Sequence, residues 1–101
     1  MDKGSYQIIW SSEALENLKN IAAYLSDNWN EKIVNNFFDE VDKKLNVLKS
    51  QPFIGQPSVK DISIRSIILS RHNRIYYSVY ENTIELLRIL DMRQNPTKNP
   101  Y

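Results

Sequence analysis

The sequence predicts an α+β fold, β-α-α-β-β-β, in which an antiparallel helical hairpin covers one face of an antiparallel sheet. Two adjacent segments in the first half of the chain carry apolar residues at three- and four-residue spacing, which is typical of amphipathic helices. The last third alternates β-branched and aromatic residues across tight turns, and one short run of this kind precedes the helices. Because an isolated three-strand meander is only marginally stable, we expect this first run to join the sheet.

The amino-terminal elements begin with a strand at residues 6–10. Ser11 and Ser12 follow, and the side chain of either is able to cap a helix, while Glu13 suits the positive end of the helix dipole. Apolar residues then recur at helical spacing to about Ser26, at Ala14, Leu18, Ile21, Ala22 and Leu25. Residues 27–30 break this helix and cap the next.

The second helix carries a broad apolar stripe opposite a charged face. The stripe consists of Ile33, Val34, Phe37, Phe38, Val41, Leu45 and Leu48. This helix ends near Ser50, because Pro52 disfavours the helical region for Gln51. Since only a short connection separates the two helices, they should form an antiparallel hairpin.

The carboxyl-terminal half is predicted to be a loop at residues 51–61, followed by strands at about 62–69, 74–80 and 83–91. The first turn lies near residues 70–73, and the second is Glu81-Asn82. Asn tolerates positive φ, so Asn82 fits a two-residue hairpin turn. Residues 95–101 are expected to form an irregular tail.

Length and composition fit one domain spanning residues 1–101, which we expect to be cytoplasmic. The chain has no cysteine, no secretory signal pattern, and no apolar run long enough to span a membrane. No group of residues has metal-ligand spacing and no glycine-rich loop could hold a nucleotide, so neither a metal nor a cofactor is expected. Residues 1–50 carry a net charge of −2 and residues 51–101 carry +3. The basic half is rich in arginine, which suits phosphates and carboxylates, although the asymmetry also fits a solvated face.

Five short motifs follow one another in a distinctive order along the chain. They are Ser12-x-Ala14-x-x-x-Leu18, Gln51-Pro52-x-x-Gly55-x-Pro57, Ile64-Arg65, Arg74-Ile75-x-Tyr77-x-Val79 and Ile89-Leu90-x-x-Arg93-Gln94-x-Pro96. Their order and spacing over residues 6–96 resemble the RelE/ParE superfamily of bacterial toxins from type II toxin–antitoxin modules. No single motif is specific, because the likeness comes from the whole series.

The resemblance implies one of two activities. RelE-like members cut messenger RNA in the ribosomal decoding site, whereas ParE-like members inhibit DNA gyrase and trap it on broken DNA. Members of both branches are silenced by a partner antitoxin that lays an extended segment and a helix across the toxin. The resemblance also implies growth inhibition and plasmid stabilisation.

Three arginines are candidate catalytic residues if the chain is a nuclease. RNA cleavage by 2′-OH attack needs a base, cations for the phosphate, and an acid for the leaving oxygen. Arg65, Arg74 and Arg88 lie on predicted strands, which would hold them rigidly around a phosphate. Simple alternation places Arg88 on the face of Ile84, Leu86 and Leu90, where it would be at the edge of a cleft or paired with a carboxylate. Glu85 and Asp91 are the carboxylates considered for that pairing.

A matching acid and base are not evident in the sequence. Nuclease members of the superfamily carry a Glu or lysines after the second helix, where this chain offers Lys60 alone. Asp91 stands where a His is common in related tails, and an ionised Asp would repel a phosphate there. His72 reads as an exposed turn residue, and Tyr101 follows two prolines at the end of the tail.

These observations favour the ParE-like branch, in which the chain binds its target and is not an enzyme. The expected partners are a cognate antitoxin, with which it would form a hetero-oligomer, and DNA gyrase; no membrane partner is expected. The target-binding residues would then be Arg88, Arg93 and Lys98 in the basic carboxyl-terminal segment. The alternatives are a RelE-like endoribonuclease acting on the ribosome and its mRNA, and a degenerate member that binds only its antitoxin.

Overall fold

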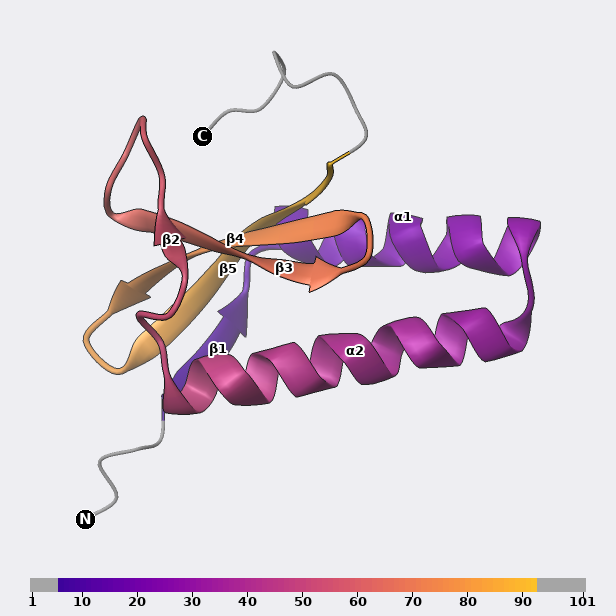
Figure 1. Cartoon of the computed structure of the whole chain (residues 1–101), viewed down its shortest axis with the longest axis horizontal. Coiled ribbons are helices and arrows are strands. Elements are labelled where there is room, and N and C mark those ends of the chain that lie inside the picture. Colours follow the sequence, from indigo (N-terminus) through magenta and orange to yellow (C-terminus); the bar gives the residue numbers. More distant parts are fainter. Residues whose placement is uncertain (1–5, 93–101) are drawn as a thin grey trace.

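Two helices pack on one face of a sheet in the computed structural model, which describes residues 6–92 (Figure 1). The elements are β1 (Gln7–Trp10), α1 (Ser12–Asn28), α2 (Glu31–Ser50), β2 (Gln56–Pro57), β3 (Ile64–Ser70), β4 (Asn73–Tyr80) and β5 (Thr83–Asp91). The strand order in the sheet is β1-β5-β4-β3-β2. The predicted α+β class, with a helical hairpin on one face of the sheet, is confirmed. The predicted tail at residues 95–101 lies outside the described residues.

The sheet differs from the prediction in two details. The first strand joins the sheet as expected, but it runs parallel to β5, with Ile8 opposite Ile84, while the remaining pairs are antiparallel. The predicted loop contains the short strand β2, which pairs Gln56 with Ser66 at the outer edge of β3. The sheet therefore begins with the first and last strands of the described chain side by side.

Polar side chains cap both helices, as the sequence indicates. The Ser11 hydroxyl accepts a 3.0 Å hydrogen bond from the Ala14 N–H, and the Asn30 side-chain oxygen accepts one of 3.0 Å from the Ile33 N–H. Of the two serines considered, Ser11 is thus the cap. Helix α1 runs to Asn28, beyond the predicted end near residue 26, so Asp27 and Asn28 belong to the helix and do not break it as predicted.

The turn between β4 and β5 has two residues, as predicted, but its strained position is not the predicted one. Tyr80 pairs with Thr83, which leaves Glu81 and Asn82 in the turn. Glu81 has a φ of 56°, and among the described residues it alone combines a side chain with positive φ. The expectation that Asn82 adopts positive φ is therefore wrong. The first turn position takes the left-handed conformation, although Asn stands at the second.

A β-bulge in β5 changes which residues share a face. Tyr77 pairs with Leu86 and Tyr76 pairs with Arg88, so Leu87 is the extra residue. Ile84, Leu86 and Ile89 consequently all lie in the core, on the face that the helices cover. Arg88 lies on the opposite face of the sheet, which the helices do not cover and which we call the open face. The prediction that Arg88 shares a face with Ile84 and Leu86 is therefore wrong, because simple alternation does not hold across a bulge.

The core extends from the sheet into the loop that follows α2. Tyr77 is fully buried, and its hydroxyl accepts a hydrogen bond from the Gly55 N–H and donates one to the Pro52 carbonyl, both at 2.9 Å. Burial raises the pKa of the Tyr77 phenol, although the hydrogen bond from Gly55 and the charge of Arg65 act in the opposite direction. One aromatic side chain thus fixes this loop against the sheet.

Candidate functional site

The three candidate arginines do not converge on one site. Arg65 pairs with Tyr77 in the β3–β4 register and therefore lies on the helix-covered face. Its Nη1 donates to the Phe53 carbonyl at 3.2 Å and to the Gly55 carbonyl at 2.8 Å, and its guanidinium lies 5.3 Å from the centroid of the Phe53 ring. Arg65 is engaged in fixing the loop between α2 and β2, so the expected cluster of three cations is not formed.

Arg74 and Arg88 lie together on the open face of the sheet. Tyr76 is opposite Arg88, and Arg74 is opposite Leu90, so the two arginines are diagonal neighbours on adjacent strands. The Nη1 of Arg74 donates a 2.9 Å hydrogen bond to the Ser66 hydroxyl. This pair is the part of the predicted set that the fold brings together.

Arg88 forms an ion pair with Glu13 from the first turn of α1. The distance between Arg88 Nη2 and Glu13 Oε2 is 2.7 Å, and about half of the Glu13 side chain is exposed. The carboxylate is neither Glu85 nor Asp91, which were the partners considered from the sequence. Sequence reasoning placed Glu13 in the first turn of a helix but had no signal for its contact with a strand 75 positions later.

The start of α1 lies beside β5 because its side chains form hydrogen bonds with the edge of β5 beyond the end of β1. Pairing between β1 and β5 ends at Trp10 and Leu86. The Ser11 hydroxyl then donates to the Leu87 carbonyl at 2.9 Å, and the Asn17 side-chain oxygen accepts from the Ile89 N–H at 2.9 Å. The side chains of the cap residue Ser11 and of Asn17 in the helix thus replace a strand along β5 and bring Glu13 to Arg88.

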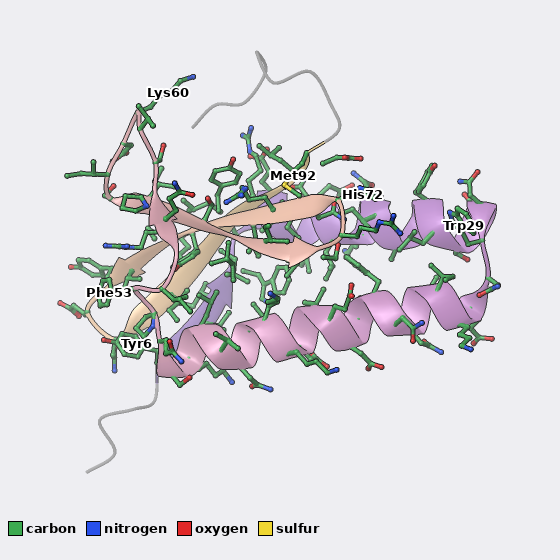
Figure 2. All side chains as sticks on the ribbon, in the orientation of Figure 1. Tyr6, Trp29, Phe53, Lys60, His72 and Met92 are labelled. Carbon is green, nitrogen blue, oxygen red and sulfur yellow. The ribbon has the colours of Figure 1, made fainter. Side chains whose placement is uncertain are left out.

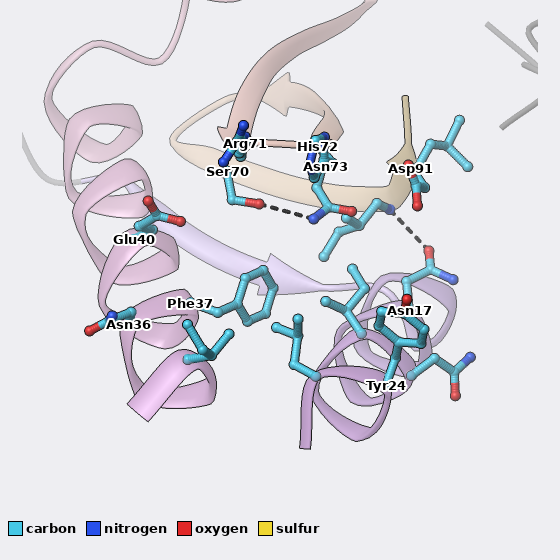
Figure 3. A pocket seen from close by; sticks show the side chains of 16 residues that line it. Asn17, Tyr24, Asn36, Phe37, Glu40, Ser70, Arg71, His72, Asn73 and Asp91 are labelled. Atoms are coloured by element: carbon cyan, nitrogen blue, oxygen red, sulfur yellow. Dashed lines mark hydrogen bonds between the residues drawn. The ribbon is translucent and has the colours of Figure 1, made fainter. Parts of the chain in front are cut away.

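The helical hairpin extends past the sheet (Figure 1). A cleft of about 720 Å³ opens there (Figure 3). Both helices and the β3–β4 turn line it. Its apolar lining consists of Ile21, Tyr24, Leu25, Ile33, Phe37, Ile89 and Leu90, and its polar lining consists of Asn17, Asn20, Asn36, Glu40, Ser70, Arg71, His72, Asn73 and Asp91. The mixed lining of aliphatic, aromatic and amide groups is suited to binding part of another protein.

Two residues considered for catalysis line this cleft. His72 belongs to the turn between β3 and β4, as predicted, but it is half-buried and not exposed as expected. Asp91 pairs with Asn73 at the end of β5. Asp91 follows the buried Ile89 by two residues and so lies on the helix-covered side, away from the face that carries Arg74 and Arg88.

The remaining candidates are separated from the arginine pair or lie outside the described part of the chain. Lys60 occupies the tip of the projecting turn between β2 and β3 (Figure 2). Arg93, Lys98 and Tyr101 lie outside the described residues. Within residues 6–92, no group of three or more His, Cys, Asp or Glu side chains is placed to hold a metal ion, and no helix is long and apolar enough to cross a membrane.

A comparison with protein families assigns the chain to one of them. The family described as the ParE toxin of the type II toxin–antitoxin system parDE matches residues 8–96. The chain belongs to the ParE toxin family. It is therefore a toxin of the toxin–antitoxin class, and the resemblance noted in the sequence to the RelE/ParE superfamily is confirmed. A comparison with curated protein sequences gave no significant match.

Solved structures share the fold of this ParE-family chain. The chromosomal ParDE system of P. aeruginosa contains a chain with a TM-score of 0.75 and 17% identity, which covers 90% of this chain and 100% of that one. A YoeB/ParE toxin from Agrobacterium tumefaciens gives 0.63 at 12% identity, covering 84% and 96%. The RelBE2 toxin–antitoxin complex from Mycobacterium tuberculosis gives 0.60 at 15% identity, covering 86% and 98%. At these identities the likeness concerns the fold.

Proposed function

We propose that this chain inhibits DNA gyrase by binding to it, and that a cognate antitoxin silences this activity. The observation that carries the proposal is the match of residues 8–96 to the ParE toxin family. The resemblance to ParE-like members implies DNA gyrase as the target. The arrangement of the arginines agrees with it, because Arg65 is engaged with carbonyl groups of its own loop. A binding inhibitor needs no trio of cations around one phosphate.

The proposed target surface includes Arg88 on the open face, together with Arg93 and Lys98 beyond the described residues. Arg88 is oriented by Glu13, which fixes a long side chain that would otherwise lose more conformational entropy on binding. About 29% of the Arg88 side chain is exposed, and a guanidinium suits a carboxylate on a partner protein. Arg88 is thus suited to contact a protein as well as a nucleic acid.

The proposed antitoxin surface is the cleft between the helical hairpin and the β3–β4 turn. Ile21, Leu25 and Phe37 supply apolar groups, and the amides of Asn20 and Asn36 supply hydrogen-bonding groups around them. An amphipathic helix presents its apolar side chains at similar spacing and keeps polar groups at its flanks. We therefore assign the helical part of the antitoxin to this cleft.

A supercoiling assay with purified gyrase tests the proposal. The DNA is analysed with and without detergent and protease, because a trapped cleavage complex releases linear DNA only after both treatments. We expect loss of supercoiling, accumulation of linear protein-linked DNA, and recovery when the antitoxin is added first. In a matched pair of variants, Arg88→Ala should weaken inhibition and Arg71→Ala, on the cleft side, should not. Unchanged supercoiling at a large excess of the chain would contradict the proposal.

The second candidate is a ribosome-dependent mRNA endonuclease, which the shared open face of Arg74 and Arg88 favours. The assay is translation of a defined mRNA followed by primer extension to map cleavage sites. This function requires new cleavage sites with the wild-type chain and their loss in Arg88→Ala with folding intact. Intact mRNA in the presence of ribosomes and excess chain would exclude it.

A further inference from the structure

The turn between β2 and β3 projects from the molecule and carries two aliphatic side chains into solvent. We call residues 58–63, Ser58-Val59-Lys60-Asp61-Ile62-Ser63, the finger; Figure 2 shows it with Lys60 at its tip. The Val59 side chain is 96% exposed and that of Ile62 is 79% exposed. Isolated exposed apolar residues are common on protein surfaces. Two of them on one short turn, with almost no packing within the chain, contribute little to folding and call for another role.

The finger is held in one conformation by its own polar groups. At its base, the Ser58 N–H donates to the Ile64 carbonyl at 2.7 Å, and the Ile64 N–H donates to the Asp61 carbonyl at 3.0 Å. The Asp61 carboxylate accepts from the Ser63 N–H at 3.0 Å and from the Ser63 hydroxyl at 2.6 Å. These two hydrogen bonds hold the pKa of Asp61 below its usual value. The polar residues thus order the turn, while the aliphatic residues project from it.

We propose that the finger is a protein contact whose Val59 and Ile62 side chains insert into an apolar pocket of the toxin's target. This inference rests on the proposed function, in which the target is DNA gyrase. A turn that is already ordered loses little conformational entropy on binding, and β-branched side chains are restricted at χ1 from the start. Aliphatic side chains that enter a pocket gain affinity because their apolar surface is removed from water. The position of Lys60 at the tip fits a carboxylate at the rim of that pocket.

The composition of the finger distinguishes a protein partner from a nucleic acid or a membrane. Bases are bound by aromatic stacking and by several cations, whereas the finger has no aromatic residue and sets the ionised Asp61 beside its one cation, Lys60. Attraction to an anionic membrane also depends on a cluster of basic residues. Two aliphatic side chains flanking an opposite-charge pair are better matched by a pocket on a protein.

The test compares two variants of the full chain in the supercoiling assay. Val59→Ser with Ile62→Ser removes both anchors, and Trp29→Ser removes a large exposed side chain, 65% accessible, from the opposite end of the molecule. We expect the double variant to need at least about tenfold more protein for half-inhibition, and Trp29→Ser to match the wild type. Unfolding midpoints and antitoxin binding should be unchanged in the double variant, because these side chains barely contact the rest of the chain.

Site-specific crosslinking gives a second readout. The chain has no cysteine, so Val59→Cys labelled with a benzophenone maleimide carries one photoreactive group at the finger. We expect a covalent adduct with a gyrase subunit, and no such adduct from Trp29→Cys treated in the same way. Two further assays test other partners of the finger. Light scattering detects binding to a second copy of the chain, and sedimentation with anionic phospholipid vesicles detects binding to a membrane.

The outcomes separate the finger from the proposed function. If the wild type inhibits gyrase and the double variant inhibits it equally well, the finger proposal is overturned and the gyrase proposal stands. If the wild type itself leaves supercoiling unchanged, the gyrase proposal fails, and the finger as a gyrase contact fails with it. Dimerisation or vesicle binding that the double variant abolishes would also overturn the assignment of the finger to the target.

Discussion

The Gly55 N–H donates a 2.9 Å hydrogen bond to the buried hydroxyl of Tyr77, and the two residues are so close that no side chain fits at position 55. A Cβ placed there would lie 2.9 Å from Tyr77 Cε1, nearer still to the hydroxyl, and 3.0 Å from the Ser66 carbonyl oxygen. Glycine is thus required here by close approach, since its φ is not positive. The contact fixes the loop that also holds Arg65.

Gly55→Ala should therefore destabilise the protein. The added methyl group forces Tyr77 or the loop to move, and overpacking of this kind costs about 1–3 kcal/mol. Urea unfolding of both proteins measures the difference. Gly4→Ala, in the segment outside the described residues, is the matched control for the loss of a glycine. An unchanged unfolding midpoint for Gly55→Ala would show that the loop does not rest on Tyr77.

The Tyr77 phenol should make stability fall at alkaline pH. Its pKa is raised above the ordinary value of 10.0 in the folded state, so the folded protein keeps the proton where the unfolded chain has lost it. The stabilisation is complete below the unfolded pKa and is lost as pH rises through the folded pKa. Denaturant unfolding from pH 8 to pH 11 measures this, with Tyr77→Phe as the control. The wild type should lose more stability than the variant over this range, and parallel curves would contradict the assignment.

Removal of Glu13 should affect target binding more than folding. Glu13→Gln breaks an ion pair whose carboxylate is half exposed, and such pairs contribute between about 0 and 1 kcal/mol to stability. The Arg88 side chain then loses its fixed orientation, so gyrase inhibition should weaken by a few-fold, towards the level of Arg88→Ala. Glu16→Gln in the same helix is the control. A double variant of Glu13 and Arg88 no weaker than Arg88→Ala alone would support action through Arg88.

Glu81→Gly should stabilise the protein. The left-handed conformation costs a residue with a side chain about 1–2 kcal/mol, and glycine's extra freedom in the unfolded chain offsets part of the gain. The expected gain is below about 1 kcal/mol and appears as a higher thermal midpoint. Asn82→Gly, at the neighbouring turn position without positive φ, should not raise it. A higher thermal midpoint for Asn82→Gly than for Glu81→Gly would indicate that the strained residue is Asn82.

Tyr24→Ala should weaken antitoxin binding without unfolding the chain. Tyr24 lines the cleft and is 55% exposed, so it is available to a partner while contributing little to the core. Loss of an aromatic contact in an interface should lower affinity by at least about tenfold, as measured by calorimetry. Tyr80→Ala, at the β4–β5 turn, removes an aromatic ring that does not line the cleft. Equal antitoxin affinities for the two variants would contradict the assignment of the antitoxin to this cleft.

The sequence predicted the elements better than it predicted their contacts. Apolar spacing and the side chains of Ser11 and Asn30 define the helices, because both signals are local. The bulge at Leu87 has no such signal: apolar residues occupy consecutive positions in β5, so the sequence is compatible with either face on each side of the bulge. That one extra residue moved Arg88 to the open face.

The candidate site was missed where it depends on contacts distant in sequence. Arg65 was grouped with Arg74 by chemistry, but the β3–β4 register places them on opposite faces. Glu13 was interpreted as a helix-dipole residue, because only the pairing of the first strand with the last reveals its neighbour. The cleft depends on how far the hairpin extends past the sheet, a property of tertiary structure.

The pairing of β1 with β5 has a consequence for the synthesis of this protein. Residues 83–91 lie between β1 and β4, so a nascent chain that lacks them has no strand to join its first strand to the meander. Contacts between such distant segments form late, because the intervening loop must close first. The chain therefore completes its fold only after β5 has left the ribosome, and translation arrested before that strand yields no finished toxin.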